Sequence, residues 1–178
     1  MSIARLSRGL VLAVALSAAS ASAETIELPK TTATLTLPAG WTAVKASGLV
    51  AAYKTADGAA LAITRADVPN PDAWKADTKA AYADKVERGI QGGIAGYKRT
   101  TKKLADVSGV PALDIEATRD GGATVLFRVL MFRTYALSLA IEVPKGIDVA
   151  PARAIVQAFA PRAPSAATQA PSTKAATR

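Results

Sequence analysis

Two acidic residues, Asp114 and Glu116, lie two positions apart in the stretch VPALDIEATR. Residues two apart in an extended strand share a face, so the two carboxylates converge. Glycosidases use such a pair, with one group as acid and the other as base or nucleophile. The alternative is a strand face whose counter-charge is Arg128. If Arg128 instead points into a pocket, then Arg128, Asp114 and Glu116 are candidate pocket residues. We favour the counter-charge, because nothing nearby in the sequence suggests a carbohydrate cleft.

The residues that most other catalytic mechanisms require are absent from this sequence. The chain has no histidine and no cysteine, which excludes Ser-His-Asp and Cys-His nucleophiles, histidine or thiolate metal sites and histidine acid–base catalysis. No Ser-x-x-Lys motif occurs, and the glycines between positions 89 and 96 end a predicted helix instead of opening one, as a phosphate loop requires. The sequence therefore predicts a protein that is not an enzyme and that uses no cofactor and no metal.

A basic segment, YKRTTKK at 97–103, is the strongest positive feature. Strand alternation places Lys98 and Lys102 on one face and Arg99 and Lys103 on the other. A buried central strand does not carry charges on both faces, so we expect an edge strand or loop whose lysines block edge-to-edge pairing. The alternative is a patch that binds phosphate, lipopolysaccharide or anionic lipid. Nucleic acid is disfavoured, because Tyr97 is the single aromatic residue in the segment.

The two ends of the chain have compositions of their own. Arg5 and Arg8, an apolar run and then Ala21-Ser22-Ala23 predict a signal peptide over residues 1–23 that is removed before Glu24. The apolar run is too short to span a membrane. Because the chain has no cysteine, we expect no lipid anchor attached through a cysteine. Residues 161–178 are rich in Ala, Pro, Ser and Thr, which predicts a disordered tail. The net charge of +8 owes much to these ends, so it is weak evidence for a polyanionic partner.

The body between the two ends, 24–160, is predicted to be one α+β domain. Alternating polar and apolar residues favour about six strands in the stretches 25–37, 49–68 and 110–143. Helical spacing and a Pro near each start predict helices at 71–92 and 151–159. Because the stretch ATVLFRVLMF is apolar on both faces, it needs cover on both sides. We therefore expect an antiparallel sheet with a helix on each face.

The pairing of two of these strands follows from their apolar faces. Matching Ile115 to Phe127 leaves a three-residue turn and places Asp114 opposite Arg128, whereas a loop longer by two places Glu116 there. In both cases Arg128 has a carboxylate across the ladder.

The strand 135–143 is expected to put Leu139 on the face that carries Ile115 and Phe127. Its opposite face, which includes Ala136 and Ala140, carries small residues that let a helix approach closely.

Several stretches together resemble the PsbP-like superfamily, which includes the photosystem II oxygen-evolving subunit P and periplasmic DcrB-like bacterial proteins. They are LPAGWTAV, the Asp57-Gly58 hairpin, the helix after NPDA, and SGVPALDIEATRDGG followed by YALSLAIEVP. The resemblance spans residues 24–160 and implies an α/β/α sandwich around an antiparallel sheet. It also implies accessory or binding roles and no catalytic residue. In that setting we expect Trp41 to fill the core beside a strand break.

Three functions follow from these observations. The first is a non-enzymatic, exported, periplasmic accessory or binding protein whose partner is a protein or another envelope component. The second is an envelope protein that binds an anionic lipid or polymer through the segment 98–103. The third is a hydrolase that uses Asp114 and Glu116. We favour the first, with neither nucleic acid nor a transmembrane anchor involved.

Overall fold

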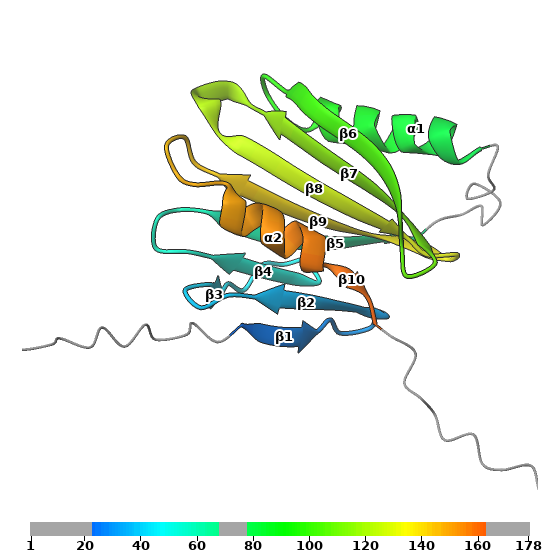
Figure 1. The fold of residues 1–178 in the computed structure, drawn as a ribbon, viewed down its shortest axis with the longest axis horizontal. Helices are drawn as coiled ribbons and strands as arrows, with labels where there is room; N and C mark the ends of the chain where they lie inside the picture. Colours follow the sequence, from blue (N-terminus) through cyan, green and yellow to red (C-terminus); the bar gives the residue numbers. More distant parts are fainter. Residues whose placement is uncertain (1–22, 68–77, 163–178) are drawn as a thin grey trace, which may run out of the picture.

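The computed structural model describes residues 23–67 and 78–162 (Figure 1). The predicted signal peptide and C-terminal tail lie outside the described residues, apart from their inner ends. The predicted start of the first helix at Pro71 lies outside them too. Within the described residues, helix α1 spans Lys79–Gly92 and ends where the Gly92-Gly93 pair predicts. Helix α2 spans Ala150–Ala158, within one residue of its predicted bounds.

The strands form two antiparallel sheets. The larger sheet has the order β3-β4-β5-β9-β8-β7-β6, and the smaller has the order β1-β2-β10. The strands of the larger sheet are β3 (Thr42–Ala43), β4 (Ala51–Lys54), β5 (Ala60–Asp67), β6 (Lys98–Val107), β7 (Val110–Thr118), β8 (Thr124–Met131) and β9 (Tyr135–Val143). Those of the smaller sheet are β1 (Glu24–Glu27), β2 (Ala33–Leu37) and β10 (Ala160–Pro161).

The described residues therefore hold more strands, in one more sheet, than the sequence predicts. Strands β3 and β10 have two residues each, too few to show alternation. Strands β1 and β2 alternate as predicted, but β2 pairs with the distant β10 and not with the larger sheet. The antiparallel α+β class itself is confirmed.

The β7–β8 hairpin has the predicted register. Ile115 lies opposite Phe127, and Asp114 lies opposite Arg128. The prediction for Leu139 is wrong, because Leu139 pairs with Arg128 and so lies on the opposite face from Phe127. Strand β8 is apolar on both faces, so its sequence does not indicate which of them lies on the same side of the sheet as Leu139 of β9.

Buried apolar side chains form two clusters that use alternate residues of β8. The first lies among the two sheets and α2, and includes Leu126, Leu130, Leu137, Ile155 and Phe159. The second brings Ala83 of α1 together with residues of β7, β8 and β9, namely Leu113, Ile115, Val125, Phe127, Val129, Met131 and Ala136. Helix α1 contributes one fully buried apolar residue to this cluster, so it covers its face of the sheet sparsely.

Candidate functional site

Arg128 and Asp114 face each other across β7 and β8. The Arg128 Nε and Nη2 atoms each donate a hydrogen bond to the Asp114 carboxylate, both 2.7 Å long. Arg128 Nη1 also donates to the carbonyl oxygens of Gln157 (3.0 Å) and Phe159 (3.3 Å) at the C-terminal end of α2. The residue is 7% exposed. A buried cation that pairs with a carboxylate and caps a helix C-terminus has a complete structural role.

Glu116 pairs with a different arginine. Arg153 of α2 donates from Nη2 and Nε to the Glu116 carboxylate, at 2.6 and 3.1 Å. These hydrogen bonds outweigh burial and hold the pKa of Glu116 below its ordinary value. Asp114, Glu116 and Arg128 do line one hollow, of about 140 Å³. A glycosidase acid needs a raised pKa, so the Glu116–Arg153 pair argues against that chemistry.

The basic segment lies on β6, at the edge of the larger sheet. A register shift between Arg99 and Thr101 interrupts the alternation, so Arg99 and Lys102 lie on the same face and both bind Glu87 of α1, at 2.9 and 2.8 Å. The predicted face assignment is therefore wrong, because a bulge adds one residue to the strand. Lys98 and Lys103 are exposed, with no ion pair to any residue that the structure describes.

Glu87 is a buried carboxylate with several partners. Besides the two cations, Tyr97 donates a hydrogen bond from its hydroxyl at 3.3 Å, and Lys102 also binds Asp84. Burial by itself raises the pKa of Glu87, but hydrogen bonds from Lys102 and Arg99 more than offset it, so the pKa of this carboxyl is lowered. This network fixes α1 to the edge strand and uses two of the four cations proposed for anion binding.

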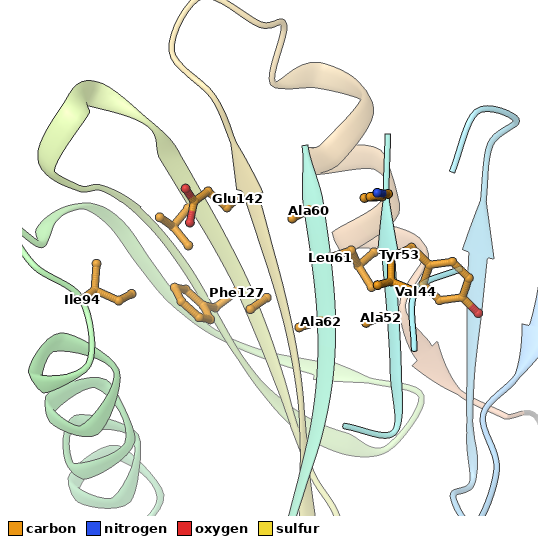
Figure 2. Close-up of a pocket in the computed structure, with 12 residues that line it drawn as sticks. Val44, Ala52, Tyr53, Ala60, Leu61, Ala62, Ile94, Phe127 and Glu142 are labelled. Atoms are coloured by element: carbon orange, nitrogen blue, oxygen red, sulfur yellow. The ribbon is translucent and has the colours of Figure 1, made fainter. Parts of the chain in front are cut away.

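An apolar hollow of about 490 Å³ opens on the α1 side of the larger sheet, beyond the part that α1 covers. Figure 2 shows its lining. The residues come from β4, β5, β8, β9 and the loops beside them. They are Val44, Ala52, Tyr53, Lys54, Ala60, Leu61, Ala62, Ile94, Val125, Phe127, Ala140 and Glu142. No stretch of the sequence by itself predicts this hollow.

The floor of the hollow is a row of paired residues that crosses four strands. Ala52 lies opposite Ala62, Ala62 opposite Ala140, and Ala140 opposite Phe127. Three consecutive methyl side chains make a shallow floor, and Phe127 forms the wall at its end (Figure 2). The small face of β9 was expected to admit a helix, yet beside Ala140 it opens into the hollow.

Ile94 forms part of the wall, on the same side as Phe127 (Figure 2). It sits in the turn after α1, which is held by the Asp120 N–H donating to the Ala95 carbonyl oxygen at 3.1 Å. Gly96 in this turn has φ +66°, and a Cβ there would overlap the Asp120 carboxylate. A glycine is therefore required for the α1–β6 turn to approach the β7–β8 turn and hold Ile94 in place.

One end of the hollow carries charge. Lys54 and Glu142 lie in one row, on either side of Ala60. Glu142 is already bound by Arg119, at 2.8 Å. Lys54 is exposed and forms no ion pair with any described residue. The hollow thus has an apolar body and, at its rim, a cation that is not paired with any residue the structure describes.

Trp41 is half-buried and packs against the first cluster, so it fills the core only in part. Its other side lines a separate hollow of about 270 Å³ together with Tyr53. Within residues 23–67 and 78–162, no three metal-ligating side chains come together. No helix in those ranges has the length and apolar character needed to cross a membrane.

The fold resembles that of a solved PsbP structure. The solution structure of cyanobacterial PsbP from Synechocystis sp. PCC 6803 matches with a TM-score of 0.55 and 14% sequence identity, covering 86% of this chain and 98% of that chain. The predicted resemblance is thus confirmed at the level of the fold. No protein-family model and no curated protein matches the sequence.

Two crystal structures match less well. One is of a protein from Bacteroides thetaiotaomicron VPI-5482, with a TM-score of 0.46 and 12% identity, covering 74% of this chain and 46% of that chain. The other is of PA94 from Pseudomonas aeruginosa, a protein of unknown function, with a TM-score of 0.44 and 18% identity, covering 80% and 99%.

Proposed function

We propose that this protein is a non-enzymatic, exported accessory protein that binds an apolar group in the hollow over β4, β5, β9 and β8. The hollow itself carries this proposal. Its volume of about 490 Å³ falls in the range of small-molecule sites, which are mostly apolar with a few polar groups. The alanines of its floor leave room that larger side chains would fill.

The absence of catalysis is part of the proposal. The two carboxylates at the hydrolase candidate are each held by an arginine, and the carboxylate of Glu87 is held by two cations. The pKa values of Glu116 and Glu87 are both lowered by their cationic partners, so these two carboxylates are poor proton donors. The PsbP-like resemblance of the sequence also implies accessory or binding roles.

Export is proposed from the N-terminal sequence alone. Arg5, Arg8 and the Ala21-Ser22-Ala23 site support removal of residues 1–23 and location in the periplasm. The intact mass of the protein recovered from the cell envelope tests this, with Glu24 as the expected first residue. A recovered mass that retains Met1–Ala23 would rule out cleavage.

Titration with a neutral, polarity-sensitive dye such as N-phenylnaphthylamine tests apolar binding. The expected result is saturable fluorescence that Ala62→Phe abolishes, because the added ring fills the floor. The control is Ala66→Phe, on the same strand and face but outside the lining residues. Equal dye binding by both folded variants would refute the proposed site.

The anion-binding alternative has less support. Arg99 and Lys102 are engaged by α1, which leaves Lys98 and Lys103 as exposed cations of the basic segment. Two exposed lysines on an edge strand are sufficient to block edge-to-edge pairing. A salt-sensitive interaction with anionic vesicles that Lys98→Ala and Lys103→Ala remove would favour this alternative.

A further inference from the structure

We propose that the hollow binds a fatty acid, that is, a single apolar chain that ends in a carboxylate. This inference rests on the proposed function and specifies its ligand. The hydrocarbon chain of the ligand lies along the alanine floor toward Phe127, and its carboxylate binds Lys54 at the rim.

The shape of the floor suits a narrow chain. The row from Ala52 through Ala62 and Ala140 to Phe127 crosses three strand spacings, or about 14 Å. Its side chains are methyl groups until Phe127, and Ile94 and Val125 add to the apolar lining. A polymethylene chain needs contact along its length and no hydrogen bonds, which is what this lining offers.

The charge at the end of the hollow selects the head group. Glu142 accepts a hydrogen bond from Arg119, so its negative charge is already balanced. Lys54 lines the hollow and forms no ion pair within the described part of the chain. An ammonium group at the rim of an apolar site attracts an anionic head and repels a cationic one. The ligand is therefore an anionic amphiphile.

Three other occupants fit the surface less well. A second copy of the chain in a two-fold dimer would place one hollow against the same hollow, and two concave surfaces do not fill each other. An apolar peptide segment would use the floor but would give Lys54 no counter-charge. A phospholipid with two chains needs a wider floor than one row of alanines.

Displacement of N-phenylnaphthylamine from the full mature chain tests the inference. The competitors are dodecanoate, dodecanol and dodecylammonium, which share a chain and differ in head-group charge. Dodecanoate is expected to bind about tenfold more tightly than dodecanol, as a hydrogen bond to a charged group provides. Dodecylammonium is expected to be the weakest of the three. Octanoate should bind more weakly than dodecanoate, because each methylene lost from the site costs about fourfold in affinity.

Variants of Lys54 test whether this residue binds the head group of the ligand. Lys54→Glu should weaken dodecanoate about tenfold or more and strengthen dodecylammonium, while dye binding is retained. The matched control is Lys45→Glu, an exposed lysine of the same charge that does not line the hollow. It should change neither affinity appreciably.

The outcomes separate this inference from the function on which it rests. If dye binds but the three competitors displace it equally, or if Lys54→Glu behaves as Lys45→Glu does, the fatty acid assignment is overturned and apolar binding stands. If dye binds and only apolar peptides displace it, the ligand is a peptide. Tighter binding of lysophosphatidylglycerol than of dodecanoate would assign a phosphate head group and overturn the carboxylate. Without dye binding, both proposals fail.

Discussion

Arg128 and Asp114 share two hydrogen bonds of 2.7 Å across the β7–β8 ladder, where they occupy directly opposite positions. The same arginine donates to two carbonyl oxygens at the end of α2. It therefore connects the sheet to the C-terminal end of a helix that comes much later in the sequence. Among the described residues the buried charged side chains are Arg128 and Glu87, and each anchors one helix to the sheet.

Replacement of Arg128 by alanine should cost about 3 kcal/mol of unfolding free energy, because the partly buried Asp114 is left without its counter-charge. Urea unfolding measures the difference. A double-mutant cycle with Asp114→Ala should show strong coupling. The cycle with Glu116→Ala should show little, because Glu116 is bound by Arg153. Stronger coupling to Glu116 than to Asp114 would contradict the pairing.

The ion pair of Arg153 with Glu116, whose arginine is more exposed than Arg128, provides the comparison for that experiment. The Arg153 side chain is half exposed, and exposed ion pairs contribute little, since solvent screens them. Arg153→Ala should therefore cost less than about 1 kcal/mol. A cost equal to that of Arg128→Ala would mean that burial does not distinguish the two arginines.

Acid should weaken the attachment of α1 through Glu87. The folded pKa of Glu87 is lowered, so its stabilising effect is complete above the unfolded pKa, which is about 4.3, and is lost as pH falls through the folded value. The difference in melting temperature between wild type and Glu87→Gln should be constant above about pH 5 and shrink below it. Parallel curves across this range would contradict the prediction.

At the alkaline end Lys102 works in the opposite direction. Burial opposes its charge, but Asp84 and Glu87 outweigh burial and raise the pKa of Lys102. Its contribution is therefore present below its unfolded pKa and is lost only as pH rises through the folded value. The attachment of α1 should be strongest between the two transitions.

The local parts of the fold could be predicted from the sequence. The register of Ile115 with Phe127 follows from two alternating strands joined by a short glycine turn, all within one hairpin. The face of the sheet on which Leu139 lies could not be predicted. Strand β8 is apolar on both faces, so Leu139 would be buried in either of the two alternative registers of β9. The bulge after Arg99 also left no signal in a segment whose charges occur on both faces.

The hollow depends on pairings between distant parts of the chain. Ala62 and Ala140 become neighbours only because β5 pairs with β9, and neither stretch alone indicates this. The wall residue Ile94 is placed by a contact between two turns. The one available signal is the run of small residues on one face of β9, and that pattern predicts room for a helix just as well as it predicts a hollow.

Substitution of Gly96 by alanine should weaken both the fold and the dye site. The positive φ at Gly96 costs a side chain about 1 kcal/mol, and the new methyl group would also overlap Asp120. Gly48→Ala is the control, since Gly48 has φ +79° with nothing within 4 Å of an added Cβ. Gly96→Ala should be at least about 1 kcal/mol less stable than Gly48→Ala and should bind dye more weakly. Equal stability would show that the turn can separate without cost.

Two alanines on the same face of β9 allow the hollow to be tested without any ligand. Ala136 is buried in the second cluster, whereas Ala140 is half-buried and borders the hollow. Ala136→Leu should overpack the cluster and cost about 1–3 kcal/mol. Ala140→Leu should be neutral or stabilising, because the added carbons enter open space and bury apolar surface.

Urea unfolding of the two leucine variants gives the comparison directly. The variants differ only in position, so strand propensity and the unfolded chain affect both alike. Because the leucine fills the hollow, Ala140→Leu should also lose dye binding, while the stability of the fold is unchanged or increased. Equal destabilisation by both substitutions would mean that the space beside Ala140 is already filled in solution, and the apolar site would then be lost as a candidate.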